Sequence, residues 1–167
     1  TVHIMIGDTT YPIHNTTPDV VDLQHILHQM VQENVEYCVM EVSSHALALG
    51  RVSGVEFDTA VFTNLTQDHL DFHKTFENYL AAKCKLFEQV SKPNQVKSGK
   101  GAVINIDDAY GHRVVEKTTA PIITYSIDGS GTLNAHDVDM TPQSSRYTVP
   151  YDGHDYTVAM NTTGLFN

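Results

Sequence analysis

The sequence predicts an α/β fold in which a mostly parallel sheet carries helices on both faces, with a small antiparallel β region toward the C-terminus. Three observations predict it: short apolar runs alternate with helical patterns, polar residues follow the apolar runs, and after Thr132 the pattern changes to short alternating segments. The 167 residues, 41% of them hydrophobic, are enough to bury one core, so we expect residues 1–167 to form a single domain.

The N-terminal part predicts an apolar stretch followed by a helix. Residues 2–6 are apolar-rich and end at a glycine turn. In the segment NTTPD, Thr17 is placed to cap a helix and Pro18 suits its first turn. Apolar residues then recur at helical spacing, so we expect a helix from about Pro18 to Glu33.

Four further runs have the composition of strands in a parallel sheet. They are residues 37–42 (YCVMEV), 57–65, 102–106 and 122–126. A short helix at 46–49, ended by Gly50, and a helical stretch at 108–117 lie between them. The alternating runs 145–149 and 156–160 predict an antiparallel hairpin.

Polar side chains follow the first two of these strands. In parallel α/β sheets, ligands bind at the carboxyl ends of the strands. The polar residues at these ends are Glu41, Ser43, Asn64 and His69. We therefore expect the functional site at this edge of the sheet.

One lysine lies inside an apolar helical stripe. Residues 75–90 predict a helix, and its stripe consists of Phe76, Leu80, Phe87 and Val90. Lys83 lies in the middle of this stripe, whereas Lys85 projects from the opposite face. Burial disfavours the ammonium and favours the neutral, nucleophilic amine, which makes Lys83 a candidate for special chemistry. The alternative is that Lys83 lies at the edge of the stripe and extends its ammonium to water.

Residues of the metal-ligand type lie just upstream, in the segment QDHLDFH. Asp68, His69, Asp71 and His73 are expected on a loop that follows a strand. A His-Asp pair is also common as a helix cap or a surface feature, so two readings stay open for this segment.

The composition excludes several classes of partner. A formal net charge of -10 disfavours nucleic acid and anionic membranes, because both are bound mainly through Lys and Arg. Cys38 and Cys84 lie in apolar segments, so we expect two core residues in a reducing compartment. No long apolar run suggests a membrane span. We expect a cytoplasmic protein with no nucleic-acid and no membrane partner.

Four segments together resemble the central domain of the Mur ligase family. They are MEVSSHALALGR (40–51), FTNLTQDHLDFH (62–73), AAK (81–83) and INIDD (104–108), and the resemblance runs from about Asn15 to Asn167. It implies a Rossmann-like sheet of the P-loop NTPase type and an ATP-dependent, ADP-forming ligase of peptidoglycan biosynthesis. The branch that it resembles adds a diamino acid, meso-diaminopimelate or L-lysine, to UDP-N-acetylmuramoyl-L-alanyl-D-glutamate through an acyl phosphate.

The resemblance implies a magnesium site made by three catalytic residues. In the family, carbon dioxide carbamylates the lysine of AAK, so Lys83 would be needed uncharged and half-buried and would then act as a carboxylate-like ligand of Mg²⁺. Glu41 and His69 would be the other ligands. Magnesium prefers hard oxygen ligands, which makes Glu41 the safer assignment of these two. Taken alone, Glu41 reads as a strand-end residue that faces solvent.

The resemblance also implies substrate contacts. Asn15, Thr16 and Thr17 match the family's NTT motif, which contacts the UDP-muramoyl substrate, with Ser43 and Arg51 on the same side. An arginine suits the phosphate or carboxylate groups of such a substrate. The role of Thr17 is the least secure, because a helix cap is a sufficient explanation for it.

Further motif residues fit the family less completely. Leu49 stands where some relatives carry a polar substrate contact, which puts that contact in doubt. The terminal GLFN resembles the start of a segment that contacts the adenine of ATP, with Asn167 as its first asparagine. Asn105, Asp107 and Asp108 match a family signature, but an acidic cap at a strand-to-helix junction explains them equally well.

One motif of a Mur ligase is not found. The family binds ATP through a loop of the form G-x-x-G-K-[ST], and this sequence has none. We therefore expect an incomplete central ATPase and substrate domain, inactive alone, without the N-terminal and C-terminal domains. Two alternatives stay open: a ligase like folylpolyglutamate synthetase, and a non-catalytic substrate-binding module. The NTTPD and EVSSHALALGR stretches favour the muramoyl ligase over the folate enzyme.

Overall fold

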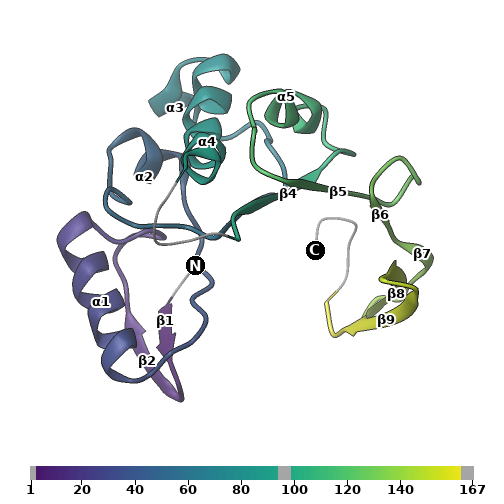
Figure 1. The fold of residues 1–167 in the computed structure, drawn as a ribbon, viewed down its shortest axis with the longest axis horizontal. Coiled ribbons are helices and arrows are strands. Elements are labelled where there is room, and N and C mark those ends of the chain that lie inside the picture. The colour runs from purple at the N-terminus through teal and green to yellow at the C-terminus, as the bar shows by residue number, and fades with distance from the viewer. Residues whose placement is uncertain (1–2, 94–98, 163–167) are drawn as a thin grey trace. The chain divides into compact units, whose positions relative to one another are not determined.

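The computed structural model describes residues 3–93 and 99–162 (Figure 1). The chain divides into two compact units. The first, which we call the helical unit, comprises Thr1–Glu56 and Gln67–Leu86, and the second, the sheet unit, comprises Phe57–Thr66 and Phe87–Asn167. Within the described ranges, no helix has both the length and the apolar character needed to cross a membrane.

The helical unit combines a β-hairpin with four helices. Its elements are β1 (His3–Ile6), β2 (Thr9–Pro12), α1 (Val20–Gln32), α2 (Ser44–Ala48), α3 (Leu70–His73) and most of α4 (Phe76–Ser91). Strands β1 and β2 pair antiparallel, with Gly7 in the turn at a φ of +56°, where glycine is favoured. Helix α1 lies along this hairpin (Figure 1), and Gln29 donates a hydrogen bond to the Tyr11 hydroxyl at 2.6 Å.

Helix α1 begins later than the sequence predicts. Its N-cap is Asp19, so the predicted capping role of Thr17 is wrong. Thr17 is instead fully buried, and its hydroxyl is bonded to the backbone of a segment more than 20 residues away. The Thr17 hydroxyl bonds to this distant backbone and not to the start of α1, so the local sequence pattern predicted the wrong partner.

The predicted strand at residues 37–42 is not formed. No strand of the described residues pairs with this segment, and Tyr37 and Val39 are 86% and 98% exposed. An apolar run becomes a strand only where a neighbouring strand accepts its hydrogen bonds and covers its side chains. Cys38 in the same segment is exposed, so the expected core position is wrong for Cys38, while Cys84 is buried as expected.

The sheet unit contains a parallel sheet followed by an antiparallel one. Its elements are β3 (Thr59–Phe62), β4 (Gly101–Asn105), α5 (Gly111–Glu116), β5 (Ile122–Ser126), β6 (Leu133–Asn134), β7 (His136–Met140), β8 (Ser145–Tyr151) and β9 (His154–Met160). The order β3-β4-β5-β6 is parallel throughout, and the order β7-β8-β9 is antiparallel. The predicted α/β class with a C-terminal antiparallel region is confirmed.

The C-terminal end of α4 packs within the core of the sheet unit. The ring of Phe87 lies 6.3 Å from that of Phe62 on β3, and both residues are 2% exposed. Ile104 on β4 and Val114 on α5 are completely buried. Each of these side chains contributes about 1.5–3 kcal/mol through burial. Phe87, a member of the apolar stripe predicted for this helix, is therefore part of the core of the sheet unit.

Two aspartates after β4 join three segments of the sheet unit. The Asp108 carboxylate accepts the backbone N–H of Leu65 at 3.0 Å and that of Tyr110 at 2.8 Å. The Asp107 carboxylate accepts the N–H of Ile127 at 2.8 Å. These bonds tie the ends of β3 and β5 to the segment before α5. The N-cap of α5 is Tyr110 and no side chain caps it, so the two aspartates hold loop backbone and the predicted acidic cap of the helix is not formed.

Candidate functional site

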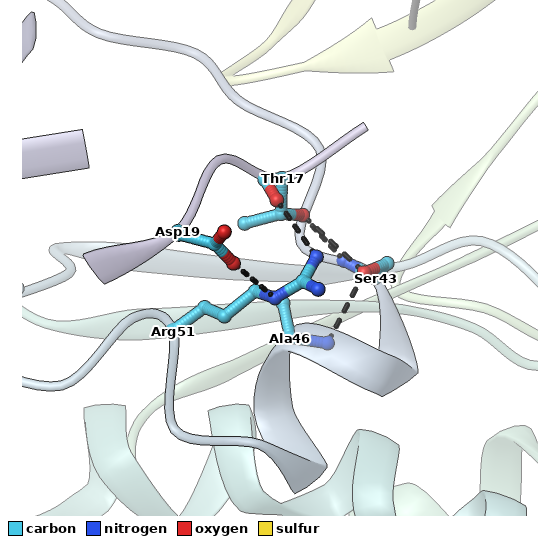
Figure 2. A network of polar contacts seen from close by, with 5 residues as sticks. All are labelled: Thr17, Asp19, Ser43, Ala46 and Arg51. Atoms are coloured by element: carbon cyan, nitrogen blue, oxygen red, sulfur yellow. Dashed lines mark hydrogen bonds and ion pairs between the residues drawn. The ribbon is translucent and has the colours of Figure 1, made fainter. Parts of the chain in front are cut away.

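Thr17 holds the EVSS segment that follows residue 40 (Figure 2). Its hydroxyl donates to the backbone carbonyl of Glu41 at 3.0 Å and accepts the backbone N–H of Ser43 at 3.0 Å. Because Thr17 is completely buried, water does not compete for these bonds. The Thr17 hydroxyl thus fixes the backbone that carries the exposed Glu41 side chain.

Ser43 begins helix α2. Its hydroxyl oxygen accepts the backbone N–H of Ala46 at 3.2 Å, as Figure 2 shows, so Ser43 is the N-cap of the short helix that the sequence predicts. Gly50 follows that helix with a φ of +72°. A cap uses one lone pair of the serine oxygen, which leaves the hydroxyl able to donate to a ligand.

Arg51 joins the same network. Its Nε lies 2.9 Å from the Asp19 carboxylate, and its Nη1 donates to the carbonyl of Thr17 at 3.2 Å (Figure 2). The Asp19 side chain is 64% exposed, so this ion pair is weak in free-energy terms. A guanidinium has five N–H donors, and the two contacts leave donors for a phosphate or a carboxylate.

Asn15 and Thr16 are exposed immediately before the buried Thr17. Asn15 lines a hollow of about 330 Å³ between the β1–β2 hairpin and α1. Ile4 and Ile26 are among the apolar residues that line it. The first two residues of the NTT motif are therefore accessible to a ligand, whereas the third, Thr17, holds the EVSS backbone.

Lys83 and His69 meet at one aromatic ring. The Lys83 Nζ lies 5.3 Å from the centroid of Tyr79, one helical turn earlier on α4. The His69 ring approaches the same tyrosine edge-on, with centroids 5.7 Å apart and an interplanar angle of 81°. Lys83 is half-buried, as predicted, and Tyr79 is buried. Two of the three predicted ligands thus lie against Tyr79.

His69 is held in an uncommon backbone conformation. Its φ is +57°, and it stands at the N-terminus of the short helix α3. The Asp68 carboxylate accepts the His69 backbone N–H at 2.7 Å and lies 3.4 Å from its Nδ1. Left-handed conformations of residues other than glycine are uncommon, and they concentrate at functional sites.

Five rings from α2, α3 and α4 and the residue before α3 form a group that we call the imidazole cluster. Its members are His45, His69, Phe72, His73 and Tyr79. The His45 ring is central, with centroids 4.9 Å from His69, 4.2 Å from Phe72 and 5.4 Å from His73. The cluster therefore connects the helix after the EVSS segment to the helix that carries Lys83.

His73 is the buried member of the cluster that has a polar partner. Its Nε2 lies 2.8 Å from the Ser44 hydroxyl, and the two residues are 6% and 2% exposed. Burial lowers the pKa of His73, and the neighbouring His45, His69 and Lys83 lower it further, against a smaller opposing effect of the Asp71 carboxylate. His73, which the sequence places among metal-type residues, therefore favours its neutral form and uses Nε2 for Ser44.

Across residues 3–93 and 99–162, no three His, Cys, Asp or Glu side chains are grouped to hold a metal ion. A carbamylated Lys83 would add hard oxygen ligands beside His69, in the unit that also contains Glu41. In its donor chemistry this set fits Mg²⁺. Asn167, predicted to contact adenine, lies outside the described residues.

Several site residues are not apparent from the sequence. Tyr79 has one signal, its spacing of four residues from Lys83 on a predicted helix. Ser44 and His73 are 29 residues apart, and no local pattern predicts their hydrogen bond. The same holds for the ion pair between Arg51 and Asp19.

Comparison with known proteins gives concordant matches. The profile of the family described as Mur ligase middle domain matches residues 1–167. The chain is 44% identical over all 167 residues to "UDP-N-acetylmuramoyl-L-alanyl-D-glutamate--2,6-diaminopimelate ligase" of Clostridium botulinum and covers 33% of that protein. The chain thus spans about a third of the length of the curated relatives that it matches.

Solved structures agree with these matches. A structure of a ligase of the same name superposes with a TM-score of 0.79 at 28% identity, over 99% of this chain and 34% of the other. An FPGS-AMPPCP complex superposes with a TM-score of 0.50 at 13% identity, over 94% of this chain and 44% of the other, which shows a shared fold alone.

Proposed function

Because the chain belongs to the Mur ligase middle-domain family, we propose that it is the central portion of an ATP-dependent ligase of peptidoglycan synthesis. The reaction would add a diamino acid to UDP-N-acetylmuramoyl-L-alanyl-D-glutamate. A relative 44% identical over the whole chain carries the name of a 2,6-diaminopimelate ligase, so diaminopimelate is the favoured diamino acid over L-lysine. The phosphate-binding loop and the other two domains would belong to further parts of the protein, which we place in the cytoplasm.

The observation that carries this proposal is the meeting of Lys83 and His69 at Tyr79. A half-buried lysine on an otherwise apolar helix face, beside an imidazole, is unusual in a purely structural region. A carbamylated lysine explains it, because carbamylation replaces a cation with a hard-oxygen ligand. Glu41, His69 and carbamylated Lys83 would then hold Mg²⁺, which would neutralise charge on the phosphoryl oxygens of ATP.

The network around Thr17 supports the substrate side of the proposal. Asn15, Thr16, Ser43 and Arg51 would bind the UDP-muramoyl-dipeptide, with Arg51 donating to an anionic group of it. Thr17 would act by fixing the EVSS backbone, since its hydroxyl already has two backbone partners. Asn167 would contact the adenine of ATP.

The proposed reaction has two steps. The D-glutamyl carboxylate attacks the γ-phosphorus of ATP, so that an acyl phosphate forms and ADP leaves. The amine of the diamino acid then attacks the acyl carbon, the amide bond forms, and inorganic phosphate leaves. The contribution of this chain is to orient the carboxylate and to provide ligands that stabilise the developing charge.

An assay of the full-length protein that contains this chain tests the proposal. ADP release should require UDP-N-acetylmuramoyl-L-alanyl-D-glutamate, Mg²⁺ and meso-diaminopimelate together. ADP release with a folate and L-glutamate would instead establish the folylpolyglutamate-type alternative. Substrate binding without ADP formation under any combination would establish the non-catalytic module.

Calorimetric titration of the 167-residue chain provides a second test. We expect binding of the UDP-muramoyl-dipeptide with little binding of magnesium-ATP, since the sequence has substrate residues but no phosphate loop. Strong binding of ATP to this chain would contradict the proposed position of the nucleotide site.

A further inference from the structure

Ser44 and His73 belong neither to the proposed magnesium ligands nor to the proposed substrate contacts, and they form a buried polar contact. Ser44 directly follows Ser43 and is 2% exposed, and His73 is the last residue of α3 and is 6% exposed. Their side chains meet at 2.8 Å. A hydrogen bond shielded from water is directional and costly to break, so this contact fixes the start of α2 against the end of α3.

His73 is also fixed on its other sides. Its ring lies nearly parallel to that of Tyr79, with centroids 5.1 Å apart and an interplanar angle of 13°. Its backbone carbonyl accepts a hydrogen bond from the Asn78 side chain at 2.9 Å. Such a ring has little freedom to move without moving Tyr79.

Tyr79 is the residue on which Lys83 and His69 meet. A continuous series of contacts therefore runs from Ser44 through His73 to Tyr79, and from there to the Lys83 ammonium and the His69 ring. The series starts next to Ser43, whose backbone N–H is held by Thr17. It connects the proposed substrate side to the proposed metal side within the helical unit.

We propose that Ser44 and His73 are positioning residues for the ligation reaction, and that their hydrogen bond sets the orientation of Tyr79 and thereby of Lys83 and His69. This inference rests on the proposed function. Neither residue touches substrate or metal in the proposal, so both act through Tyr79. Small displacements of reacting groups lower rates steeply, which gives a buried contact outside the ligand set a measurable effect on catalysis.

Three variants of the full-length protein test this proposal. His73→Phe keeps a ring on Tyr79 and removes the nitrogen, Ser44→Ala removes the partner hydroxyl, and the double variant removes both. We expect each single variant to lower kcat about 10-fold with the KM for ATP within about 2-fold, as for a group that acts on orientation. The double variant should be no slower than the slower single variant, because both changes break one contact.

A matched control separates positioning from stability. Thr118 of the sheet unit is 8% exposed and donates a buried hydrogen bond to the Val114 carbonyl at 2.7 Å. Thr118→Val removes a buried bond of similar length away from the imidazole cluster. It should lower the thermal midpoint as much as Ser44→Ala does, and it should leave kcat at 25 °C unchanged.

A second readout does not depend on turnover. In ¹³C-bicarbonate, a carbamylated Lys83 should give a carbamate carbon signal in the NMR spectrum that Lys83→Ala abolishes, and His73→Phe and Ser44→Ala should weaken it. Wild-type kcat and carbamate signal in folded Ser44→Ala and His73→Phe would overturn the positioning role. Ser44→Ala removes only one oxygen atom, so it still tests the positioning role if His73→Phe does not fold. A wild-type protein without ligation and without a carbamate signal would overturn the proposed function itself, and this inference with it.

Discussion

The imidazole cluster of the helical unit and the two aspartates after β4 in the sheet unit use their polar groups in different ways. In the sheet unit, the Asp108 carboxylate accepts two backbone N–H groups and the Asp107 carboxylate accepts another. In the helical unit, the rings of His45, His69 and Tyr79 contact one another: the His69 ring meets both the His45 ring and the Tyr79 ring. The two carboxylates bind backbone near the ends of strands, whereas the imidazole cluster positions side chains with a proposed function.

The family resemblance alone does not distinguish these two polar groups, but their different partners do. The INIDD segment and the QDHLDFH segment both match family motifs, and both follow strands or strand-like runs. Removing a group with backbone partners should lower stability. Removing a group that has ring neighbours and a proposed ligand role should lower activity.

The largest effect is expected for Lys83→Ala in the full-length protein. Loss of a ligand that stabilises charge in the transition state should lower kcat by at least about 100-fold, while the thermal midpoint stays close to the wild-type value because Lys83 is only half-buried. A short carboxylic acid should partly restore turnover by replacing the lost carboxylate-like group. Steady-state ADP release measures both effects.

Lys85→Ala is the matched control, because Lys85 lies on the exposed face of the same helix. It should retain wild-type turnover and should not respond to added carboxylic acid. Near wild-type turnover of Lys83→Ala would remove Lys83 from the mechanism and would place the imidazole cluster with the structural networks.

A large loss of stability without loss of a ligand is expected for Asp108→Ala. The substitution leaves the Leu65 and Tyr110 N–H groups without their acceptor, and we expect unfolding of the sheet unit to become easier by about 2 kcal/mol. Urea unfolding followed by circular dichroism measures this. Glu88→Ala, at an exposed position of α4, is the control and should change stability by less than about 0.5 kcal/mol.

The sequence predicts the parts of this molecule that depend on local patterns. The runs that become β4 and β5 are identified because their apolar residues are numerous and consecutive, and the helix around Lys83 is identified because its apolar positions repeat at helical spacing. The approach of Lys83 and His69 to the same Tyr79 ring requires only that the segment around α3 and helix α4 fold back on each other. These features are set within about 20 residues of chain.

Features that depend on distant partners are not predictable in this way. The run at 37–42 has the composition of a strand, but its state depends on whether another strand lies beside it. Thr17 has the pattern of a cap, but its hydroxyl pairs with the EVSS backbone. Ser44 and His73 pair over 29 residues. In each case the outcome depends on which distant segment lies beside the residue in the folded chain, which a local pattern does not contain.

A smaller effect, confined to mildly acid pH, is expected from His73. Burial lowers its folded-state pKa below the unfolded value of about 6.5, so the neutral form stabilises the fold. That contribution is complete above about pH 6.5 and is lost as the pH falls through the folded pKa. His73→Gln should remove this part of the acid dependence. Thermal unfolding between pH 8 and pH 5, with His112→Gln on the exposed surface of α5 as control, measures it. Identical pH dependence in wild type and His73→Gln would contradict it.

The smallest effect is expected at Asp128 in the sheet unit, and it should occur in a different pH range. Hydrogen bonds from the Ser126 and Ser130 hydroxyls and the Ser130 N–H lower the pKa of this exposed carboxyl. The stability that its charged form adds is complete above the unfolded pKa of about 3.9 and is lost as the pH falls through the folded pKa. Asp128→Asn should therefore unfold slightly earlier than wild type at pH 7, and the difference should disappear in strong acid. A difference that vanished already between pH 7 and pH 5 would show that the two regions do not titrate separately. Loss of stability below the unfolded pKa of a histidine for His73, and only below that of an aspartate for Asp128, would show that the neutral imidazole stabilises one unit and the charged carboxylate the other.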